Sequence, residues 1–242
     1  MSDNLSEIDV VILCGGQGTR LRPVVSDRPK ALAKIGEKTF LDILIDDLRR
    51  SGFKNIILCI GYLKKAIKDH IINKNDYNIS FSEEDVPLGT GGALKKAEPM
   101  IKSSPFIVMN GDSICKINFH DFYNFHLDKM ATLSMALVQT TSSQDFGSVV
   151  LDESNRIVSY REKEANLGEP LINAGVYLME REIFSLMPDQ DRFSMEYDFF
   201  PQLAGGRLFG FAVDGELMDI GTPERYKKAN YLIRGGNESK IW

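Results

Sequence analysis

The chain has 242 residues, 43% of them hydrophobic and 26% charged, which is usual for a globular protein long enough to bury a substantial core. Its 29 Lys and Arg and 34 Asp and Glu residues give a net charge of −5, which argues against a nucleic-acid-binding protein, because such proteins need a basic surface. No apolar run approaches the roughly 20 residues of a membrane helix, and residues 1–9 are too polar for a signal peptide, so we expect a cytoplasmic protein that binds neither nucleic acid nor membrane.

The predicted elements begin with a buried strand over residues 10–14. It leads into residues 15–38, which carry glycines, prolines and charges without periodicity. We expect a long loop there, and a loop this long in a compact domain is usually functional. Helical spacing of apolar residues then predicts a helix over 40–48, with Thr39 available as its N-cap.

Strand and helix patterns continue to alternate up to residue 138. In chain order they predict a strand over 55–60, a helix over 64–72, a strand over 79–82, a Gly-rich turn with a helix that stops at Pro99, a strand over 106–110, a helix over 119–129 and a strand over 132–138. Such alternation predicts an α/β fold: a Rossmann-like, mostly parallel mixed sheet with helices on both faces. Right-handed crossovers place the carboxyl ends of the parallel strands at one edge, where ligands of such sheets bind.

The second half of the chain has a different pattern. Strands over 149–151, 157–160, 172–179 and 208–213 are separated by polar turns, with helices near 181–187 and 223–233. These elements predict a small mixed or antiparallel extension. Because no linker rich in Pro, Gly or Ser and no repeat interrupts the sequence, we expect a single domain over 1–242 with two halves, about 10–140 and about 141–235.

The loop after the first strand reads GGQGTRLRPVVSDRPKAL from Gly15 to Leu32. It lacks the glycine spacing of a Rossmann fingerprint and the Gly-Lys-Ser/Thr of a P-loop. Glycines let backbone N–H groups approach phosphate oxygens, Arg20 can make two hydrogen bonds to a phosphate, and Lys30 adds a point charge. A lone glycine pair would indicate only a turn with surface charge, but the whole string favours an anion site.

The string from Gly15 to Lys30 resembles the GGxGTRLxPxTxxxPK signature of sugar-1-phosphate nucleotidylyltransferases, with Val25 where Thr is common and Cys14 where Ala is common. The resemblance extends along the chain through PLGTGGAL, NGD, EK, NAGVY and DIGTPERY. It implies the fold of nucleotide-diphospho-sugar transferases, with a nucleotide-binding first half and a sugar-phosphate-binding second half. It also implies Mg²⁺ as cofactor, a nucleoside triphosphate and a sugar 1-phosphate as substrates, and leaves a homo-oligomer open.

The resemblance further implies roles for individual residues. Arg20 and Lys30 would be catalytic, and Asp112 and Asp219 would hold Mg²⁺, which prefers one or two carboxylates with phosphate oxygens and water. The implied nucleotide-binding residues are Leu13, Gly15, Gly16, Gly18, Thr19, Glu84, Gly89, Thr90 and Asp112. The implied sugar-phosphate-binding residues are Gly147, Glu162, Lys163, Asn173, Gly175 and Glu196.

Several of these residues have a plainer interpretation when taken alone. Asp112 would be a turn residue, Asp219 a polar residue before a helix, and the pair Glu162 and Lys163 a solvated charge run. The three cysteines lack metal spacing and predict buried reduced thiols, and the three histidines lie outside the motifs and receive no catalytic role.

The nucleobase and the sugar follow from the same resemblance. A carboxylate at Glu84 would accept two hydrogen bonds from guanine, which favours GTP, with Glu83 as the alternative if the alignment slips by one residue. The motif set is most similar to family members that transfer GMP to D-glycero-D-manno-heptose 1-phosphate, giving GDP-heptose for bacterial surface polysaccharides and pyrophosphate. Mannose, glucose or N-acetylmuramate 1-phosphate with GTP, UTP or dTTP are the alternatives.

Two other classes of protein are weighed against an enzyme of this family. A non-catalytic nucleotide-sugar-binding regulatory subunit usually lacks the phosphate-contacting and metal-binding residues, whereas Arg20, Lys30, Asp112, Asp219 and Lys163 are all present. A nicotinamide-dependent Rossmann enzyme would need a glycine spacing that this chain does not have.

Overall fold

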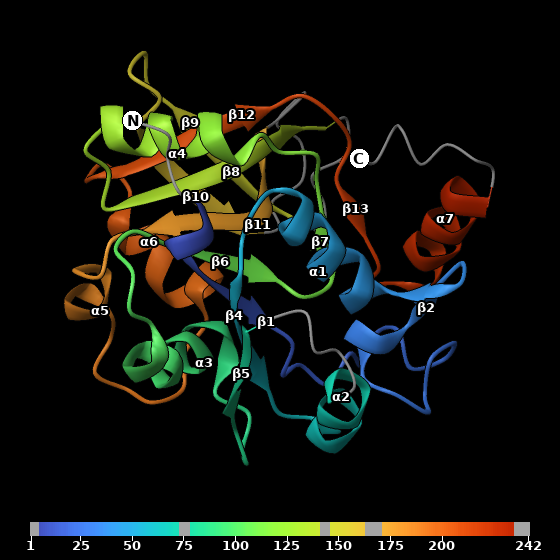
Figure 1. Ribbon diagram of the computed structural model, residues 1–242. Helices are drawn as coiled ribbons and strands as arrows, with labels where there is room; N and C mark the ends of the chain where they lie inside the picture. Colours follow the sequence, from blue (N-terminus) through green and yellow to red (C-terminus); the bar gives the residue numbers. More distant parts are fainter. Residues whose placement is uncertain (1–4, 73–77, 141–145, 163–170, 235–242) are drawn as a thin grey trace.

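A nine-stranded mixed sheet forms the centre of the computed structural model, which describes residues 5–72, 78–140, 146–162 and 171–234 (Figure 1). Its strands follow the order β10-β9-β11-β6-β1-β4-β5, with β8 paired to β11 and β12 to β8. They are β1 (Asp9–Leu13), β4 (Asn55–Ile60), β5 (Asn78–Glu83), β6 (Phe106–Asn110), β8 (Leu133–Gln139), β9 (Gly147–Leu151), β10 (Ile157–Glu162), β11 (Leu171–Met179) and β12 (Leu208–Val213).

The first half of the chain forms the parallel part of the sheet. β1 lies between β4 and β6 and runs parallel to both, and β5 runs parallel to β4. Buried apolar side chains of these strands point alternately to the two faces, as strand geometry requires. Val10 and Ile12 belong to one core cluster and Val11 to the other. The predicted parallel sheet is therefore confirmed, and its strands at 55–60 and 106–110 have the predicted bounds.

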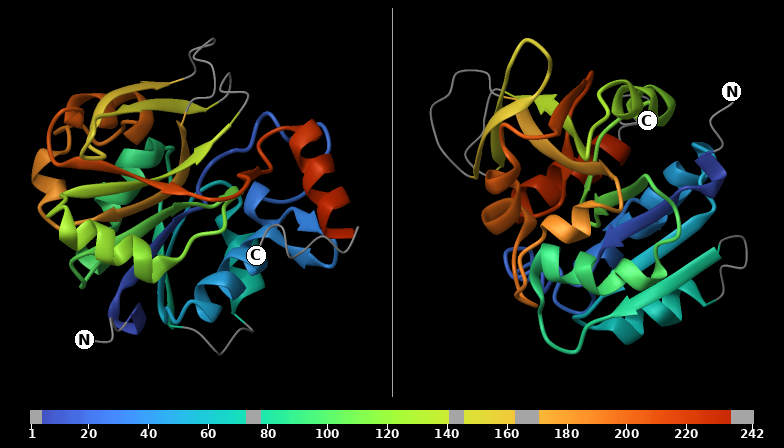
Figure 2. Two further views of the ribbon diagram at one scale, coloured as in Figure 1. Left: turned by 90° about the horizontal axis from the view of Figure 1, so that it is seen from above. Right: turned by 90° about the vertical axis from the view of Figure 1, so that its left-hand side faces the viewer.

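Helices cover both faces of the sheet, as predicted, and the two views of Figure 2 show the layers from above and from the side. The core cluster of Val10 receives side chains from α1 (Phe40–Arg50), α2 (Lys64–Ile71), α4 (Phe119–Asp128) and α7 (Pro223–Arg234). The core cluster of Val11 receives side chains from α3 (Gly89–Ala97), α5 (Ile183–Leu186) and α6 (Phe200–Leu203).

Thr39 caps α1, as its sequence predicts. The Thr39 hydroxyl accepts a hydrogen bond from the Asp42 backbone N–H, and the Asp42 carboxylate accepts one from the Thr39 backbone N–H. This reciprocal capping satisfies two of the backbone donors that a helix start leaves without partners. It also ends the long loop at a fixed residue.

The second half of the chain continues the same sheet instead of forming a separate layer. β11 pairs antiparallel with β6, which joins the two halves at the centre of the molecule. β8 and β9 pair antiparallel with β11, β10 pairs antiparallel with β9, and β12 returns parallel to β8. The expected mixed character is thus confirmed.

Short elements that the sequence pattern did not predict complete the fold. Two-stranded ribbons pair β2 (Lys34–Ile35) with β3 (Lys38–Thr39), and β7 (Ser113–Ile114) with β13 (Met218–Asp219). Single helical turns occur at η1 (Leu5–Glu7), η2 (Lys30–Leu32) and η3 (Glu98–Met100), and a π-helical turn, η4 (Met195–Phe199), precedes α6. Among the described residues, no helix has the length and apolar character needed to cross a membrane.

Candidate active site

A cavity of about 480 Å³ lies beside the carboxyl ends of β1 and β6. In the sheet, β4 and β5 lie on one side of β1, and β6 and β11 lie on its other side. The cavity therefore occupies the point where the strand order reverses. Open α/β sheets bind ligands at such a point. Both halves of the chain contribute to the walls, from Leu13 and Glu84 in the first to Gly147 and Arg225 in the second.

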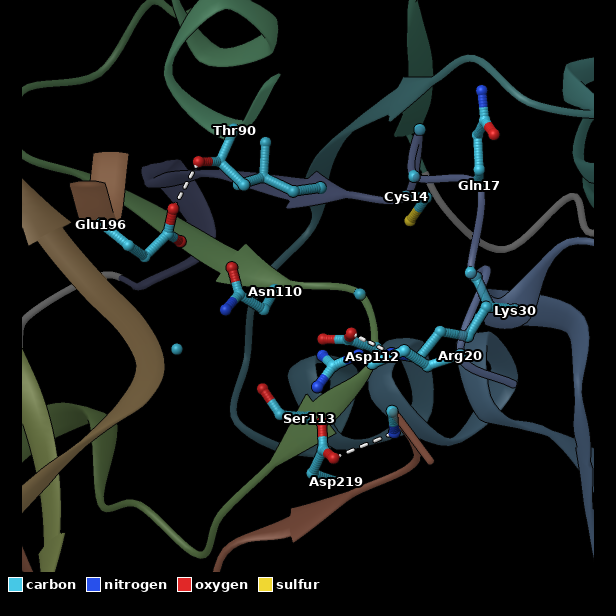
Figure 3. A pocket seen from close by; sticks show the side chains of 18 of the residues that line it. Cys14, Gln17, Arg20, Lys30, Thr90, Asn110, Asp112, Ser113, Glu196 and Asp219 are labelled. Carbon is cyan, nitrogen blue, oxygen red and sulfur yellow. Dashed lines mark hydrogen bonds and ion pairs between the residues drawn. The ribbon is translucent and has the colours of Figure 1, made fainter. Parts of the chain in front are cut away.

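The loop after β1 wraps one side of this cavity. Gly18 has a left-handed backbone with φ of 58°, which glycine adopts without the steric cost that other residues meet. Its missing side chain also makes room for Lys30, whose Cβ would lie 3.1 Å from a Cβ at position 18. Arg20 and Lys30 both line the cavity, and Figure 3 shows their side chains near Asp112.

Two carboxylates stand side by side at the other wall. β7 and β13 pair Ser113 with Asp219, and the Ile220 backbone N–H donates to the Asp112 carbonyl over 3.0 Å. Lys30 Nζ donates to Asp112 Oδ2, while Asp219 Oδ1 accepts from Arg225 Nη1 at 2.9 Å. The cavity therefore holds two cation–carboxylate pairs next to each other, and these side chains are mostly buried.

Asp112 and Asp219 form a donor set that fits Mg²⁺. Proteins usually bind this ion with one or two carboxylates, and phosphate oxygens and water complete its coordination. Two neighbouring carboxylates that face one cavity match that arrangement. Among the described residues, no cluster of three or more His, Cys, Asp or Glu side chains offers a fuller set of protein ligands. This composition suits a metal bound together with a phosphate substrate better than a structural metal.

Glu84 lies on the side of the cavity formed by β4 and β5. Its Oε2 accepts a hydrogen bond from the Leu88 backbone N–H at 3.2 Å. Its Oε1 packs over two glycines, so that a Cβ at Gly15 or Gly61 would lie 2.7 or 2.5 Å from that oxygen. Burial raises the pKa of the Glu84 carboxyl.

Glu83, the alternative base reader, is placed elsewhere. It is paired with Lys68 at 2.6 Å and Lys64 at 3.5 Å, and it is not among the residues that line the cavity. Successive residues of a strand point to opposite faces, which separates the two neighbouring glutamates. Of the two, Glu84 is the one that faces the cavity.

The start of α3 is tied to the π-helical turn η4. The Thr90 hydroxyl donates to Glu196 Oε2 at 2.6 Å (Figure 3). It also accepts from the Met195 backbone N–H at 2.9 Å. The Phe193 carbonyl accepts from the N–H groups of Gly91 and Gly92 at 3.0 and 3.3 Å. These hydrogen bonds therefore link the base side of the cavity to its Glu196 side.

On the sugar-phosphate side, Gly147, Asn173 and Gly175 line the cavity. The Asn173 amide donates to the Tyr177 hydroxyl at 2.8 Å and to the Tyr160 hydroxyl at 3.3 Å, and its Oδ1 accepts from the Gly175 backbone N–H at 2.9 Å. These hydrogen bonds fix the Asn173 side chain against β11, next to Gly175, whose φ is 75°.

The cavity collects most of the residues that the resemblance singled out. Those that line it are Leu13, Gly15, Gly16, Gly18, Thr19, Arg20, Lys30, Glu84, Gly89, Thr90, Asp112, Gly147, Asn173, Gly175, Glu196 and Asp219. The backbone of Glu162 ends β10, where it pairs with Gly147, while Lys163 lies outside the described residues.

Several lining residues received no role from the sequence: Gln17, Asn110, Ser113, Phe146, Tyr197 and Arg225. Three of them stand inside the motifs, Gln17 in GGQGTRL, Asn110 in NGD and Arg225 in DIGTPERY, and had no role assigned there. Arg225 also packs 4.3 Å from the ring centroid of Phe146, just before Gly147. A place inside a motif was the only sequence signal that could have pointed to these residues. The direction of their side chains is shown only by the fold.

Comparison with known proteins agrees with this geometry. The chain matches the family described as "Nucleotidyl transferase" over residues 9–235. It is 34% identical over 224 residues to D-glycero-alpha-D-manno-heptose 1-phosphate guanylyltransferase of Aneurinibacillus thermoaerophilus, and the match covers 92% of this chain and 96% of the relative. A mannose-1-phosphate guanylyltransferase of Mycobacterium tuberculosis is 30% identical, with 95% of this chain and 66% of the relative covered.

A solved structure is similar over nearly the whole chain. HddC of Yersinia pseudotuberculosis, crystallised in complex with GMP-PN, is 38% identical, with a TM-score of 0.82, and the match covers 93% of this chain and 99% of that one.

Proposed function

The chain belongs to the nucleotidyl transferase family, and from this premise we propose that it transfers GMP from GTP to D-glycero-D-manno-heptose 1-phosphate, releasing pyrophosphate and GDP-heptose. The observation that carries the proposal is the single cavity in which the glycine loop, Arg20 and Lys30 face the carboxylates of Asp112 and Asp219. A cavity with cations and carboxylates together suits two phosphate-bearing substrates.

The reaction needs positioning and charge neutralisation more than acid–base chemistry. An oxygen of the sugar 1-phosphate attacks the α-phosphorus of GTP in line, its bond to phosphorus forms as the bond to the pyrophosphate oxygen breaks, and the attacking oxygen is already ionised near neutral pH. Arg20 makes hydrogen bonds to the phosphate oxygens where charge develops, and Lys30 contributes a second positive charge. No protein nucleophile or base is required.

Asp112 and Asp219 are the residues that would hold Mg²⁺. The chemistry that the ion would supply there is neutralisation of phosphate charge. In the structure, Lys30 and Arg225 each donate a hydrogen bond to one of the two carboxylates, which fixes the direction of both side chains. Lys30 thus has two partners in the cycle, Asp112 and the phosphates.

The base preference rests on Glu84. Guanine offers two adjacent donors, N1–H and the 2-amino group, to a carboxylate, whereas uracil and thymine offer only N3–H. The position of Glu84 on the cavity wall and the names of the relatives both support GTP. The choice of heptose 1-phosphate as the sugar substrate is supported by the names of the relatives alone. Those names give a manno-heptose and a mannose, which share a mannose-type ring. A protein that consumes GTP would work in the cytoplasm.

The test is pyrophosphate release from the purified protein, measured for GTP, ATP, CTP, UTP and dTTP against the 1-phosphates of manno-heptose, mannose, glucose and N-acetylmuramate. We expect GTP with manno-heptose 1-phosphate to give the highest kcat/KM and chelation of Mg²⁺ to abolish turnover. A preference for UTP or dTTP would refute the guanylyl assignment. Release with no pair of substrates would support the regulatory subunit.

Asp112→Asn supplies the internal control of this assay. An amide is a poor partner for a hard dication, so turnover should fall by at least about a hundredfold. Asp69→Asn is the matched control, because Asp69 lies on the exposed side of α2, where it forms an ion pair with Lys65 at 2.6 Å. It should leave turnover unchanged, and equal losses in both variants would remove Asp112 from the mechanism.

A further inference from the structure

Asn110, the last residue of β6, carries an atom whose hydrogen bonding is incomplete. Among the described residues, two buried side-chain nitrogen or oxygen atoms lack a hydrogen-bond partner, Asn110 Oδ1 and His126 Nε2. His126 Nε2 has Glu180 Oε1 at 3.5 Å, outside the cavity of the active site. For Asn110 Oδ1 no hydrogen-bond partner is found in the part of the chain that the structure describes, and Asn110 lines that cavity. A buried acceptor without a donor is costly, so its presence needs an explanation.

We propose that Asn110 Oδ1 accepts a hydrogen bond from a ring hydroxyl of the sugar 1-phosphate. The proposal rests on the proposed function and assigns to that same site a residue that discriminates between sugars. The missing partner must be a donor. Phosphate oxygens are acceptors, so the hydroxyl groups of the substrates are the donors that can reach the middle of the cavity.

The direction of the side chain distinguishes the sugar from the nucleotide. Asn110 pairs with Leu13 of β1, and the residue before it in β6, Met109, pairs with Val176 of β11, which follows Gly175. A Cβ at Gly175 would lie 2.7 Å from Asn110 Nδ2 and 3.1 Å from its Cβ, so the amide leans over β11. Glu84 lies on the other side of β1, beyond β4. Asn110 therefore turns toward the sugar-phosphate side and away from the base.

The surroundings of Asn110 support a role in recognition. In Figure 3 it stands between Glu196 on one side and Ser113 and Asp112 on the other, and its amide points into the open space of the cavity. A hydroxyl held there would be next to the carboxylates proposed to bind metal and phosphate. Gly175 is required at this place because any Cβ would push the amide away.

The experiment uses two variants and a set of analogues. Asn110→Leu keeps the volume and removes the acceptor, Asn110→Ser shortens the side chain, and Asn78→Leu, at the exposed start of β5 on the opposite edge, is the matched control. Pyrophosphate release is measured with GTP and α-D-mannose 1-phosphate, and with its 2-deoxy, 3-deoxy and 4-deoxy analogues, which share ring hydroxyls with manno-heptose. Thermal unfolding of each variant reports whether it folds.

We expect Asn110→Leu to lower kcat/KM for the sugar 1-phosphate by about tenfold, with the KM for GTP changed less than about twofold. In the native protein, removing the hydroxyl that Asn110 binds should cost a similar factor. Removing the same hydroxyl should cause no further loss of kcat/KM in Asn110→Leu, because both changes remove the same hydrogen bond and their effects are then not additive. If Asn110→Leu does not fold, Asn110→Ser carries the same expectation.

Two results would overturn the inference: additive losses for every deoxy analogue, or an increase in the KM for GTP in place of the sugar effect. Failure of the proposed function is a separate result, since the native protein would then release no pyrophosphate from GTP and any sugar 1-phosphate. Asn78→Leu should match the native protein throughout.

Discussion

At the scale of single residues, the base preference depends on one carboxylate, Glu84. If it accepts from both N1–H and the 2-amino group of guanine, ITP should be a poor substrate, because the missing amino group leaves a buried carboxylate oxygen without a donor. That costs at least about 1–3 kcal/mol, so kcat/KM for ITP should be roughly tenfold to a hundredfold below that for GTP. Glu84→Gln should narrow this ratio and admit UTP slightly. An unchanged GTP to ITP ratio in the variant would exclude Glu84 as the base reader.

The two neighbouring glutamates should also respond oppositely to pH. Burial raises the pKa of the Glu84 carboxyl. At pH values above the ordinary pKa of a glutamate, the folded chain therefore holds a proton that the unfolded chain has lost. The contribution of Glu84 to stability then falls as pH rises. Lys68 lowers the pKa of Glu83, whose contribution instead increases as pH rises and is lost as pH falls. From pH 4 to 7 without nucleotide, the Tm of Glu84→Gln should therefore rise relative to the native protein and that of Glu83→Gln should fall. Parallel shifts would contradict the two placements.

The residue scale also shows what a sequence can predict about the site. Glycine, arginine and aspartate positions were predictable because a long motif fixes them together. The distinction between Glu83 and Glu84 was not, since it depends on which face of β5 turns to the cavity. Asn110 was missed for a similar reason: an unpaired acceptor exists only relative to the tertiary neighbours that fail to pair with it.

At the scale of elements, the close contact between α3 and the segment before η4 makes a specific demand on Gly92. A Cβ there would lie 2.1 Å from the Asp191 carbonyl oxygen, which is backbone and must shift. Although Ala is the better helix former by about 1 kcal/mol, we expect Gly92→Ala to destabilise the protein by about 1–3 kcal/mol. Since Thr90 holds Glu196, the KM for the sugar 1-phosphate should rise as well.

Lys96→Ala is the matched control for Gly92→Ala, because Lys96 lies on the exposed face of the same helix. Its unfolding free energy in urea should stay within about 0.5 kcal/mol of the native value. If Gly92→Ala were as stable as this control, the packing of residue 191 on α3 would not constrain the helix.

Elements with many apolar residues were predictable, and short ones were not. β4, β6 and β12 have the predicted bounds, because a buried strand is a run of apolar side chains between polar turns. β7 and β13 have two residues each, too few for any periodicity, and their pairing joins residues 113 and 219 across more than a hundred positions. The order of strands in the sheet likewise depends on pairings that no local pattern contains.

At the scale of the whole molecule, the two halves of the chain are joined at the site that they share. β6 pairs with β11 across the middle of the sheet, β7 pairs with β13, and the start of α3 is capped by Phe193 of the second half. Both core clusters contain apolar side chains of β6 and of β11, so each half would lose buried apolar contacts if the other unfolded. The single domain expected from the sequence therefore predicts that the two halves unfold cooperatively.

We accordingly expect one unfolding transition in calorimetry, with equal calorimetric and van't Hoff enthalpies, and one that nucleotide shifts as a unit. GTP with Mg²⁺ at about 100 times its Kd should stabilise the folded chain by about 2.7 kcal/mol, which for a protein of this size raises the Tm by roughly 5–10 °C. Because the phosphates would contact the loop after β1 and the carboxylates of β7 and β13 together, both halves should gain this stability. A second transition that stays at its original temperature would instead show that the halves unfold independently, and that the nucleotide is held by the first half alone.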